Sequence, residues 1–217
     1  SARVVEAAKL LAAAKYPLIV AGGGVHLSGA HEVLAELQEA ASLPVATTSM
    51  GKGAVAETHA LSLGVIGYFM GTRGMARHMR ELVDRADCVL FVGDRTNQNG
   101  TDSWTLFPKA AKYIHVDVDS LEVGRNYEAL RLVGDAKITL NALSDAMACM
   151  DLSVRKAARA EVEQKIAAGK KAFQAEADAM LESDAVPVRP ERLMNDLRGV
   201  MTSNAHGVQI EIGRAHV

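Results

Sequence analysis

Short, continuous apolar runs alternate with longer amphipathic stretches over the first 150 residues. An apolar run without polar alternation is typical of a strand buried on both faces, as in a parallel sheet. Between the runs, apolar residues spaced three and four apart predict helices. The expected strands are 18–21, 44–48, 88–92, 113–118 and 130–133, and the expected helices are 3–14, 30–41, 73–86 and 136–149. This alternation predicts an α/β fold, a three-layer α/β/α domain with a mostly parallel, Rossmann-like sheet.

The rest of the chain has a different composition. Residues 151–185 are charged and rich in Ala, lack strand signals, and predict one or two solvated helices that form a helical linker. In residues 186–217, Pro187 and Pro190 bracket a short stretch before a further helix expected at 191–199. No domain-sized element follows, so we expect 186–217 to be the start of a truncated C-terminal domain or a tail. The first domain is expected to cover 1–150.

Composition and charge narrow the class of protein. Hydrophobic residues make up 49% and charged residues 23% of the 217 residues, which is typical of a globular protein and argues against a disordered chain. The formal net charge of −2 provides no general basic field for nucleic acid or an anionic membrane. Cys88 and Cys149 lie far apart and make neither a disulfide framework nor a zinc site. We therefore expect a cytoplasmic protein without nucleic-acid or membrane partners.

Candidate binding residues follow the expected strands, at the edge where parallel sheets bind their ligands. Gly22, Gly23 and Gly24 follow the first strand, where glycine would let backbone N–H groups approach a phosphate or a flavin. The alternative is a tight turn that needs glycine for a positive φ. The glycines do not complete the dinucleotide fingerprint Gly-x-Gly-x-x-Gly, because Leu27 occupies the last glycine position.

A basic residue follows the strand expected at 88–92. Arg95, in the sequence Gly93-Asp94-Arg95, could fork onto a diphosphate, because the guanidinium group matches the spacing of phosphate oxygens. The alternative is a surface salt bridge to Asp94 or Asp102. The residues alone leave both roles open.

Two acidic residues end later strands. Asp117, near the end of 113–118, is placed to accept hydrogen bonds from ribose hydroxyls, or instead to cap the turn at 119–123. Asp135 directly precedes the helix expected at 136–149 and is favoured as its N-cap over a role as a ligand.

Catalytic signatures are absent from the sequence. His31 and Glu32 begin a His-Glu-x-x-His zinc motif, but Ala35 occupies the second histidine position. Gly51 and Lys52 are followed by glycine instead of the Ser or Thr that a P-loop requires, and no Gly-x-Ser-x-Gly motif occurs. We therefore assign no catalytic residue and no metal ligand in this chain.

The segments taken in order resemble the central domain of thiamine-diphosphate-dependent enzymes of the acetolactate synthase type, a group that includes oxalyl-CoA decarboxylase, glyoxylate carboligase and benzaldehyde lyase. The stretch Pro187-x-x-Pro190-Glu191-Arg192-Leu193 resembles the lead-in to the family's third domain. The resemblance spans roughly residues 1–200. Six sequence blocks that match in the family's order identify the family more specifically than any single block. The blocks are 17–25 (PLIVAGGGV), 43–53 (LPVATTSMGKG), 63–67 (LGVIG), 86–95 (ADCVLFVGDR), 115–119 (HVDVD) and 133–136 (VGDA).

The resemblance implies a parent subunit of three α/β domains that decarboxylates 2-oxo acids with carboligation and forms a homo-oligomer. The other two domains bind thiamine diphosphate and Mg²⁺, so the present chain is expected to be inactive alone. The central domain has a FAD/NAD-binding type of fold and holds FAD in acetolactate synthase relatives, ADP in oxalyl-CoA decarboxylase and nothing in others. The positions that match the family's nucleotide contacts are Gly22, Gly23, Thr47, Ser49, Met50, Gly64, Gly93, Arg95, Asp117 and Asp135.

The sequence departs from the flavin-binding members near this site. Asn97 and Asn99 stand where those members carry Asp and Arg, Ile66 where they often carry His, and Lys52 where they carry an apolar residue. Lys52 and Arg95 together would suit an ADP-like diphosphate or a CoA substrate. Two alternatives are a standalone FAD- or NAD-binding module of the electron-transfer-flavoprotein type, and a scaffold that only supports subunit contacts. The ordered blocks and the proline lead-in have no role in a standalone module.

Overall fold

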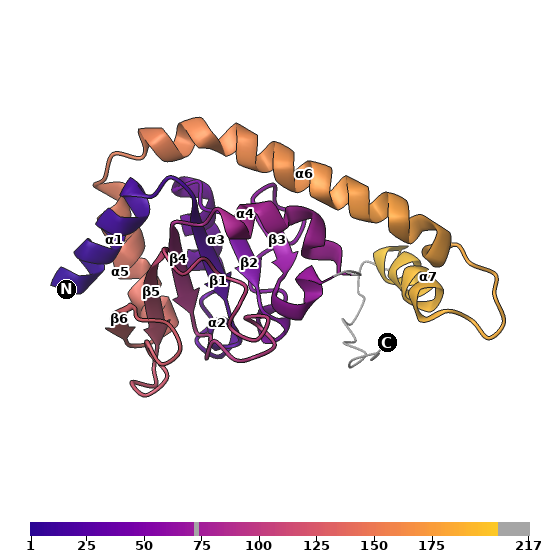
Figure 1. Cartoon of the computed structure of the whole chain (residues 1–217), viewed down its shortest axis with the longest axis horizontal. Helices are drawn as coiled ribbons and strands as arrows, with labels where there is room; N and C mark the ends of the chain where they lie inside the picture. The colour runs from indigo at the N-terminus through magenta and orange to yellow at the C-terminus, as the bar shows by residue number, and fades with distance from the viewer. Residues whose placement is uncertain (72–73, 204–217) are drawn as a thin grey trace. The chain divides into compact units, whose positions relative to one another are not determined.

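The computed structural model describes residues 1–71 and 74–203, which divide into two compact units, Ser1–Lys170 and the residues from Lys171 onward. The first unit holds a six-stranded sheet with helices on both faces (Figure 1). The strand order is β3-β2-β1-β4-β5-β6, and every neighbouring pair is parallel. The predicted α/β fold with a parallel sheet is confirmed.

The elements follow the predicted alternation closely. The strands are β1 (Pro17–Ala21), β2 (Val45–Thr47), β3 (Ser62–Val65), β4 (Cys88–Val92), β5 (Lys112–Asp117) and β6 (Leu130–Val133). The longer helices of the first unit are α1 (Ala2–Ala13), α3 (His31–Ala40) and α5 (Ala136–Ala148), with the one-turn helix α2 (Gly24–Leu27) after β1. Each predicted strand corresponds to an observed strand with ends shifted by no more than two residues.

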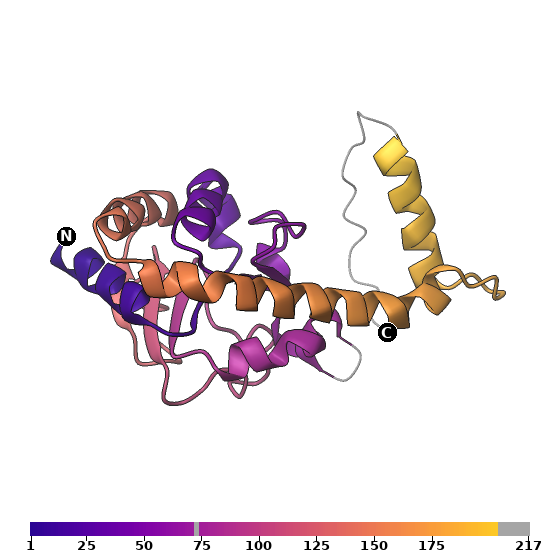
Figure 2. The ribbon, with the colours of Figure 1, turned by 90° about the horizontal axis from the view of Figure 1, so that it is seen from above.

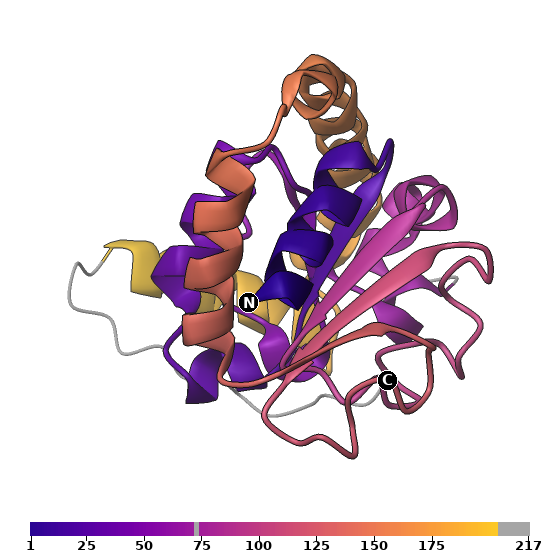
Figure 3. The ribbon, with the colours of Figure 1, turned by 90° about the vertical axis from the view of Figure 1, so that its left-hand side faces the viewer.

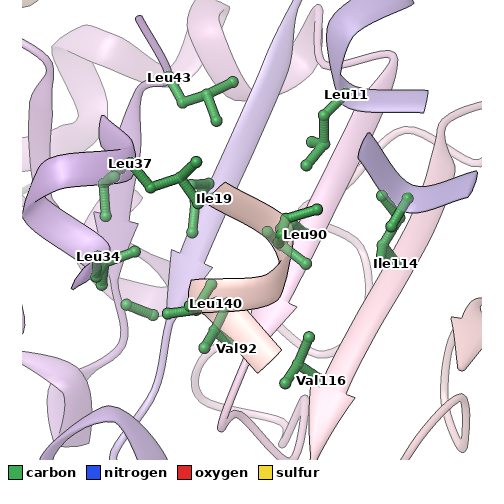
Figure 4. Close-up of a cluster of buried hydrophobic side chains, with 14 of the residues drawn as sticks. Leu11, Ile19, Leu34, Leu37, Leu43, Leu90, Val92, Ile114, Val116 and Leu140 are labelled. Carbon is green, nitrogen blue, oxygen red and sulfur yellow. The ribbon is translucent and has the colours of Figure 1, made fainter. Parts of the chain in front are cut away.

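The central strands are apolar because the sheet is covered on both faces. Every residue of β1 and of β4 is buried. One face packs against α1, α3 and α5 (Figure 3), where Leu11, Leu34 and Leu140 meet strand residues such as Ile19 and Leu90 (Figure 4). On the other face a second cluster includes the rings of the strand residues Phe91 and Tyr113.

Two elements differ from the prediction. Strand β3 was not predicted, because Ser62 and Gly64 interrupt its apolar pattern. In the structure the buried hydroxyl of Ser62 donates a hydrogen bond to the carbonyl of Ala56 at 2.8 Å. Gly64 has a φ of +81° at the point where the pairing with β2 shifts register. The helix predicted at 73–86 was wrong as one helix. The chain forms the 3-10 helix η3 (Met75–Met79) and then a short α4 (Arg80–Asp84), and residue 73 lies outside the described residues.

The charged segment after residue 150 forms one helix, α6 (Ser153–Leu181), seen without a break in Figure 2. Its first half belongs to the first unit, and Ile166, 1% exposed, packs into the cluster around Phe91. In the second unit α7 (Pro190–Ser203) begins with proline at the position where a missing N–H costs nothing. Residues 204–217 of the predicted tail lie outside the description, and no described helix is long and apolar enough to cross a membrane.

Candidate functional site

The strand order reverses between β1 and β4, since the chain proceeds from β1 toward β3 on one side and from β4 toward β6 on the other. Ligands of open parallel sheets bind at such a point, beyond the carboxyl ends of the strands. The two loops that leave β1 and β4 are joined directly. Gly22 donates its N–H to the carbonyl of Val92 and Gly24 to that of Gly93, both at 2.9 Å.

The glycines after β1 are required by close packing of backbone. A Cβ at Gly22 would lie 2.3 Å from the carbonyl oxygen of Gly93, and one at Gly24 would lie 2.6 Å from the Cα of Gly93. Gly23 has a φ of −62°, so the alternative that this turn needs positive φ is wrong for it. Gly93 itself does need glycine for its conformation, with a φ of +57°. The result is a segment of bare backbone at the point where the strand order reverses.

The loop after β2 adds polar and apolar groups. Thr47 ends the strand, is buried, and its hydroxyl has no hydrogen-bond partner among the described residues. Thr48 caps the 3-10 helix η1 (Ser49–Gly51) by accepting the N–H of Gly51 at 3.2 Å. Met50 is 71% exposed, and Ser49 is half-buried. This loop therefore presents one unsatisfied hydroxyl and one exposed thioether side chain at the carboxyl end of the sheet.

Lys52 is already paired with a carboxylate. Its Nζ lies 2.6 Å from Oε1 of Glu57. Ile66, the other departure in this region, is 1% exposed and packs in the core. Because Glu57 already neutralises the ammonium group of Lys52, the structure argues against the expectation that Lys52 and Arg95 bind a diphosphate together.

Arg95 is exposed and its guanidinium group forms no hydrogen bond or ion pair with any described residue. The alternative of a salt bridge to Asp94 or Asp102 is not observed. Asp94 accepts the N–H of Thr96, and the carboxylate of Asp102 lies 3.9 Å from Arg80. The cation next to the bare backbone is therefore available to an anionic ligand.

Asp94 was predicted from the sequence only as an alternative salt-bridge partner of Arg95. It is 6% exposed, its Oδ1 accepts the N–H of Thr96 at 3.1 Å, and its Oδ2 is buried without a described partner. Burial, opposed by that hydrogen bond and reinforced by the charge of Asp117, raises the pKa of Asp94 to about 6. Burial of this carboxyl group could not be seen in the sequence, because it follows from the contact of the two loops.

His115 holds the loop of Asp94 from β5. Its Nδ1 accepts the N–H of Gly124 at 3.1 Å, so Nε2 carries the proton and donates to the carbonyl oxygen of Asp94 at 2.8 Å. Burial lowers the pKa of His115, which favours the neutral ring, and its two hydrogen bonds select this tautomer. The histidine is therefore a positioning group for the loop after β4.

Thr96 is held in an uncommon conformation. It is fully buried with a φ of +48°, a region that costs energy for a β-branched residue. Asn126 donates to its carbonyl at 3.1 Å and its hydroxyl at 3.0 Å, and the indole N–H of Trp104 donates to the same carbonyl at 3.0 Å. These bonds fix the loop that presents Arg95.

The two acidic candidates lie at the ends of β5 and β6. Asp117 accepts the N–H of Asp119 with Oδ1 at 3.0 Å, which is the turn-capping role, and its Oδ2 has no described partner. Asp135 caps α5 by accepting the N–H of Ile138 at 3.0 Å, as favoured from the sequence. Gly64 lies inside β3. No group of three or more His, Cys, Asp or Glu within 1–71 and 74–203 is arranged to hold a metal ion.

The strand order and the glycine-rich reversal point define a doubly wound α/β fold with a parallel sheet. Residues 4–143 match the family described as "Thiamine pyrophosphate enzyme, central domain". The chain belongs to this family. A standalone flavin-binding module is not favoured by this match.

The relatives are much longer than this chain. It is 36% identical over 200 residues to a "Probable acetolactate synthase large subunit" of Methanocaldococcus jannaschii, covering 92% of this chain and 32% of the relative. It is 40% identical over 163 residues to a "Sulfoacetaldehyde acetyltransferase" of Roseovarius nubinhibens, covering 70% of this chain and 26% of the relative. The chain thus spans about a third or less of the proteins it resembles.

A solved structure supports the fold. A candidate thiamin diphosphate-dependent enzyme isolated from Mycobacterium smegmatis superimposes with a TM-score of 0.56 at 22% sequence identity. The match covers 69% of this chain and 28% of that one. At this identity the likeness concerns the fold alone.

Proposed function

We propose that this chain is the nucleotide-binding central domain of an acetolactate synthase-like enzyme that decarboxylates 2-oxo acids and joins the products. In that enzyme the domain supports the other two domains of the subunit and binds the adenosine diphosphate part of FAD or ADP. One observation carries the nucleotide proposal. Bare backbone from the loops after β1 and β4 meets an unpaired arginine at the point where the strand order reverses.

Each group at this point has a proposed role toward the nucleotide. The backbone of Gly22, Gly23 and Gly93 lies against the diphosphate, and glycine is required at Gly22 and Gly93 because the two loops pack closely there. Arg95 forks onto the phosphate oxygens. The free Oδ2 of Asp117 accepts a ribose hydroxyl while Oδ1 remains in its turn.

The remaining candidates lie toward β2 and β3. Ser49 and Met50 border the group attached to the diphosphate, and the unsatisfied hydroxyl of Thr47 supplies a hydrogen bond to it. Gly64 lies in the neighbouring strand β3, paired with Ala46 of β2, and has a φ of +81°. Asp135 caps α5 with Oδ1, and we assign its Oδ2 to the nucleotide as a further hydrogen-bond acceptor.

Thiamine diphosphate with Mg²⁺ supplies the carbanion chemistry of the parent enzyme when bound. The described residues offer no metal-binding cluster, and the relatives are about three times longer than this chain. We therefore assign that cofactor to parts of the parent outside this chain, and we propose that the parent is a homo-oligomer.

The nucleotide proposal is tested by thermal unfolding of the 217-residue chain with FAD, ADP, ATP, NAD and CoA. A ligand at a hundred times its Kd stabilises the folded chain by about 2.7 kcal/mol, which raises Tm measurably. We expect FAD or ADP to raise Tm, Arg95→Ala to remove the rise, and the control Arg3→Ala, at an exposed arginine of α1, to keep it. An unchanged Tm with every nucleotide would contradict the proposed site.

A further inference from the structure

The side chain of Asp94 packs against the glycine backbone where the loops after β1 and β4 meet. A Cβ at Gly22 would lie 2.7 Å from both the Cα and the Cβ of Asp94. Asp94 is 6% exposed; its Oδ1 accepts the N–H of Thr96, and its Oδ2 has no hydrogen-bond partner among the described residues. An acidic group is therefore enclosed next to the backbone to which we assign the diphosphate.

The groups around Asp94 do not neutralise its charge. Burial, with a smaller contribution from the negative charge of Asp117 at the end of β5, raises the pKa of Asp94 to about 6. His115 donates to the carbonyl of Asp94, and Tyr127, which follows β5, is near enough for the charge of Asp94 to act on it. Burial lowers the pKa of His115 and raises that of Tyr127 to about 12, so both side chains are neutral near pH 7. Arg95, the next residue in the chain, is the cation that we assign to the diphosphate.

The balance of charge at this point depends on the ionisation of Asp94. When Asp94 is ionised, it and Asp117 place two negative charges beside the single positive charge of Arg95. When Asp94 is protonated, the charges of Asp117 and Arg95 cancel. A diphosphate brings further negative charge, so it is repelled by the ionised form of Asp94 and not by the neutral form. This repulsion acts through space and requires no contact between the carboxyl group and the ligand.

We propose that the chain takes up a proton at Asp94 when it binds the diphosphate of a nucleotide, so that its affinity for the nucleotide falls as the pH rises. The proton comes from the solvent and bonds to Oδ2, because Oδ1 already accepts the N–H of Thr96. Since the bound diphosphate disfavours the ionised carboxylate, the complex holds this proton more tightly than the free chain does. This inference rests on the proposed nucleotide site and adds that pH controls its affinity.

The test is isothermal titration calorimetry of the 217-residue chain with FAD, whose diphosphate is esterified at both ends and does not titrate near neutral pH, and with ADP in a parallel series. Titrations at pH 6.5 in buffers of different ionisation enthalpy count the protons taken up on binding. One negative charge about 12 Å away, at an effective dielectric constant of about 20, changes the ionisation constant of a carboxyl group about tenfold. We therefore expect uptake of about half a proton per FAD at pH 6.5, and a Kd about five- to tenfold higher at pH 8 than at pH 5.5.

Asp94→Asn removes the ionisation, so it should abolish the proton uptake with FAD and bind about five- to tenfold more tightly than the unsubstituted chain at pH 8. The matched control Asp102→Asn removes a carboxylate of the same loop, 3.9 Å from Arg80, and should keep both the proton uptake and the pH dependence.

Two results would overturn this inference and leave the nucleotide site standing. One is equal proton uptake by the unsubstituted chain and by Asp94→Asn, a comparison that also cancels the ionisation of ADP itself. The other needs no variant: an equal Kd for FAD at pH 5.5 and pH 8 in the unsubstituted chain. Absence of binding of both nucleotides at every pH from 5.5 to 8 would overturn the nucleotide site together with this inference.

Discussion

Replacing the buried carboxyl group of Asp94 by an amide is expected to stabilise the chain at neutral pH. The pKa of Asp94 is raised from 3.8 to about 6, mainly by burial. A rise of about 2 in pKa corresponds to about 3 kcal/mol of differential stability between the two protonation states. Because the folded chain binds this proton more tightly than the unfolded chain, the free energy of unfolding falls as pH increases from about 4 to about 6 and stays lower above that range.

Asp94→Asn removes the ionisation and retains the oxygen that accepts the N–H of Thr96. Below about pH 4 both side chains are neutral and carry a donor at the position of Oδ2, so the two proteins should be nearly equally stable. Above about pH 6 the variant should be more stable by up to about 3 kcal/mol. An increase in the free energy of unfolding is unusual for such a substitution, since most substitutions of buried residues destabilise the fold.

The assay is urea unfolding at pH 4, 5, 6 and 7.5, followed by the fluorescence of the single tryptophan, Trp104. This residue reports on the same loop, because its indole N–H is bonded to the carbonyl of Thr96. Asp145→Asn, the same substitution at an exposed position of α5, is the control and should change stability by less than about 0.5 kcal/mol. A stability difference for Asp94→Asn that is independent of pH, or a variant less stable than the unsubstituted chain at pH 7.5, would show that the buried charge of Asp94 does not destabilise the fold.

Two further substitutions test the loops around the reversal point. Gly22→Ala places a Cβ 2.3 Å from the carbonyl oxygen of Gly93, so we expect the free energy of unfolding in urea to fall by about 2 kcal/mol or more. Any rise in Tm caused by a nucleotide should also be lost. Gly29→Ala is the control: a Cβ there meets no atom within 4 Å, so only the strain of its φ of +61° acts. Asn126→Ala removes two hydrogen bonds to Thr96 and should cost about 1–3 kcal/mol while shifting the Trp104 emission, and an unaltered emission spectrum would mean that Asn126 does not fix this loop.

The sheet could be predicted where its residues are uniformly apolar. Strands β1 and β4 are buried at all their positions, and their continuous runs in the sequence reflect that directly. Strand β3 escaped prediction because its buried Ser62 is compensated by hydrogen bonds to Gln38 and Ala56, partners that are remote or irregular in sequence. A hydropathy pattern alone does not indicate such hydrogen bonds.

In the candidate site, likewise, the sequence predicted roles that depend on neighbouring residues and missed those that depend on distant ones. The N-cap role of Asp135 was favoured from the sequence because it depends on residues three positions apart. The burial of Asp94, the tautomer of His115 and the conformation of Thr96 depend on contacts between different strands and loops, so no local pattern indicates them. The burial of Arg155 in α6 also has no local signal, because this charged segment was predicted to be solvated.

The proposed nucleotide site is best tested by a crystal structure of this chain grown with ADP and, separately, with FAD. We predict density for the diphosphate against the backbone of Gly22 to Gly24 and Gly93, with the guanidinium group of Arg95 within hydrogen-bond distance of its oxygens and the ribose near Asp117. Density at any other place on the chain, or an empty reversal point at saturating nucleotide concentrations, would contradict it.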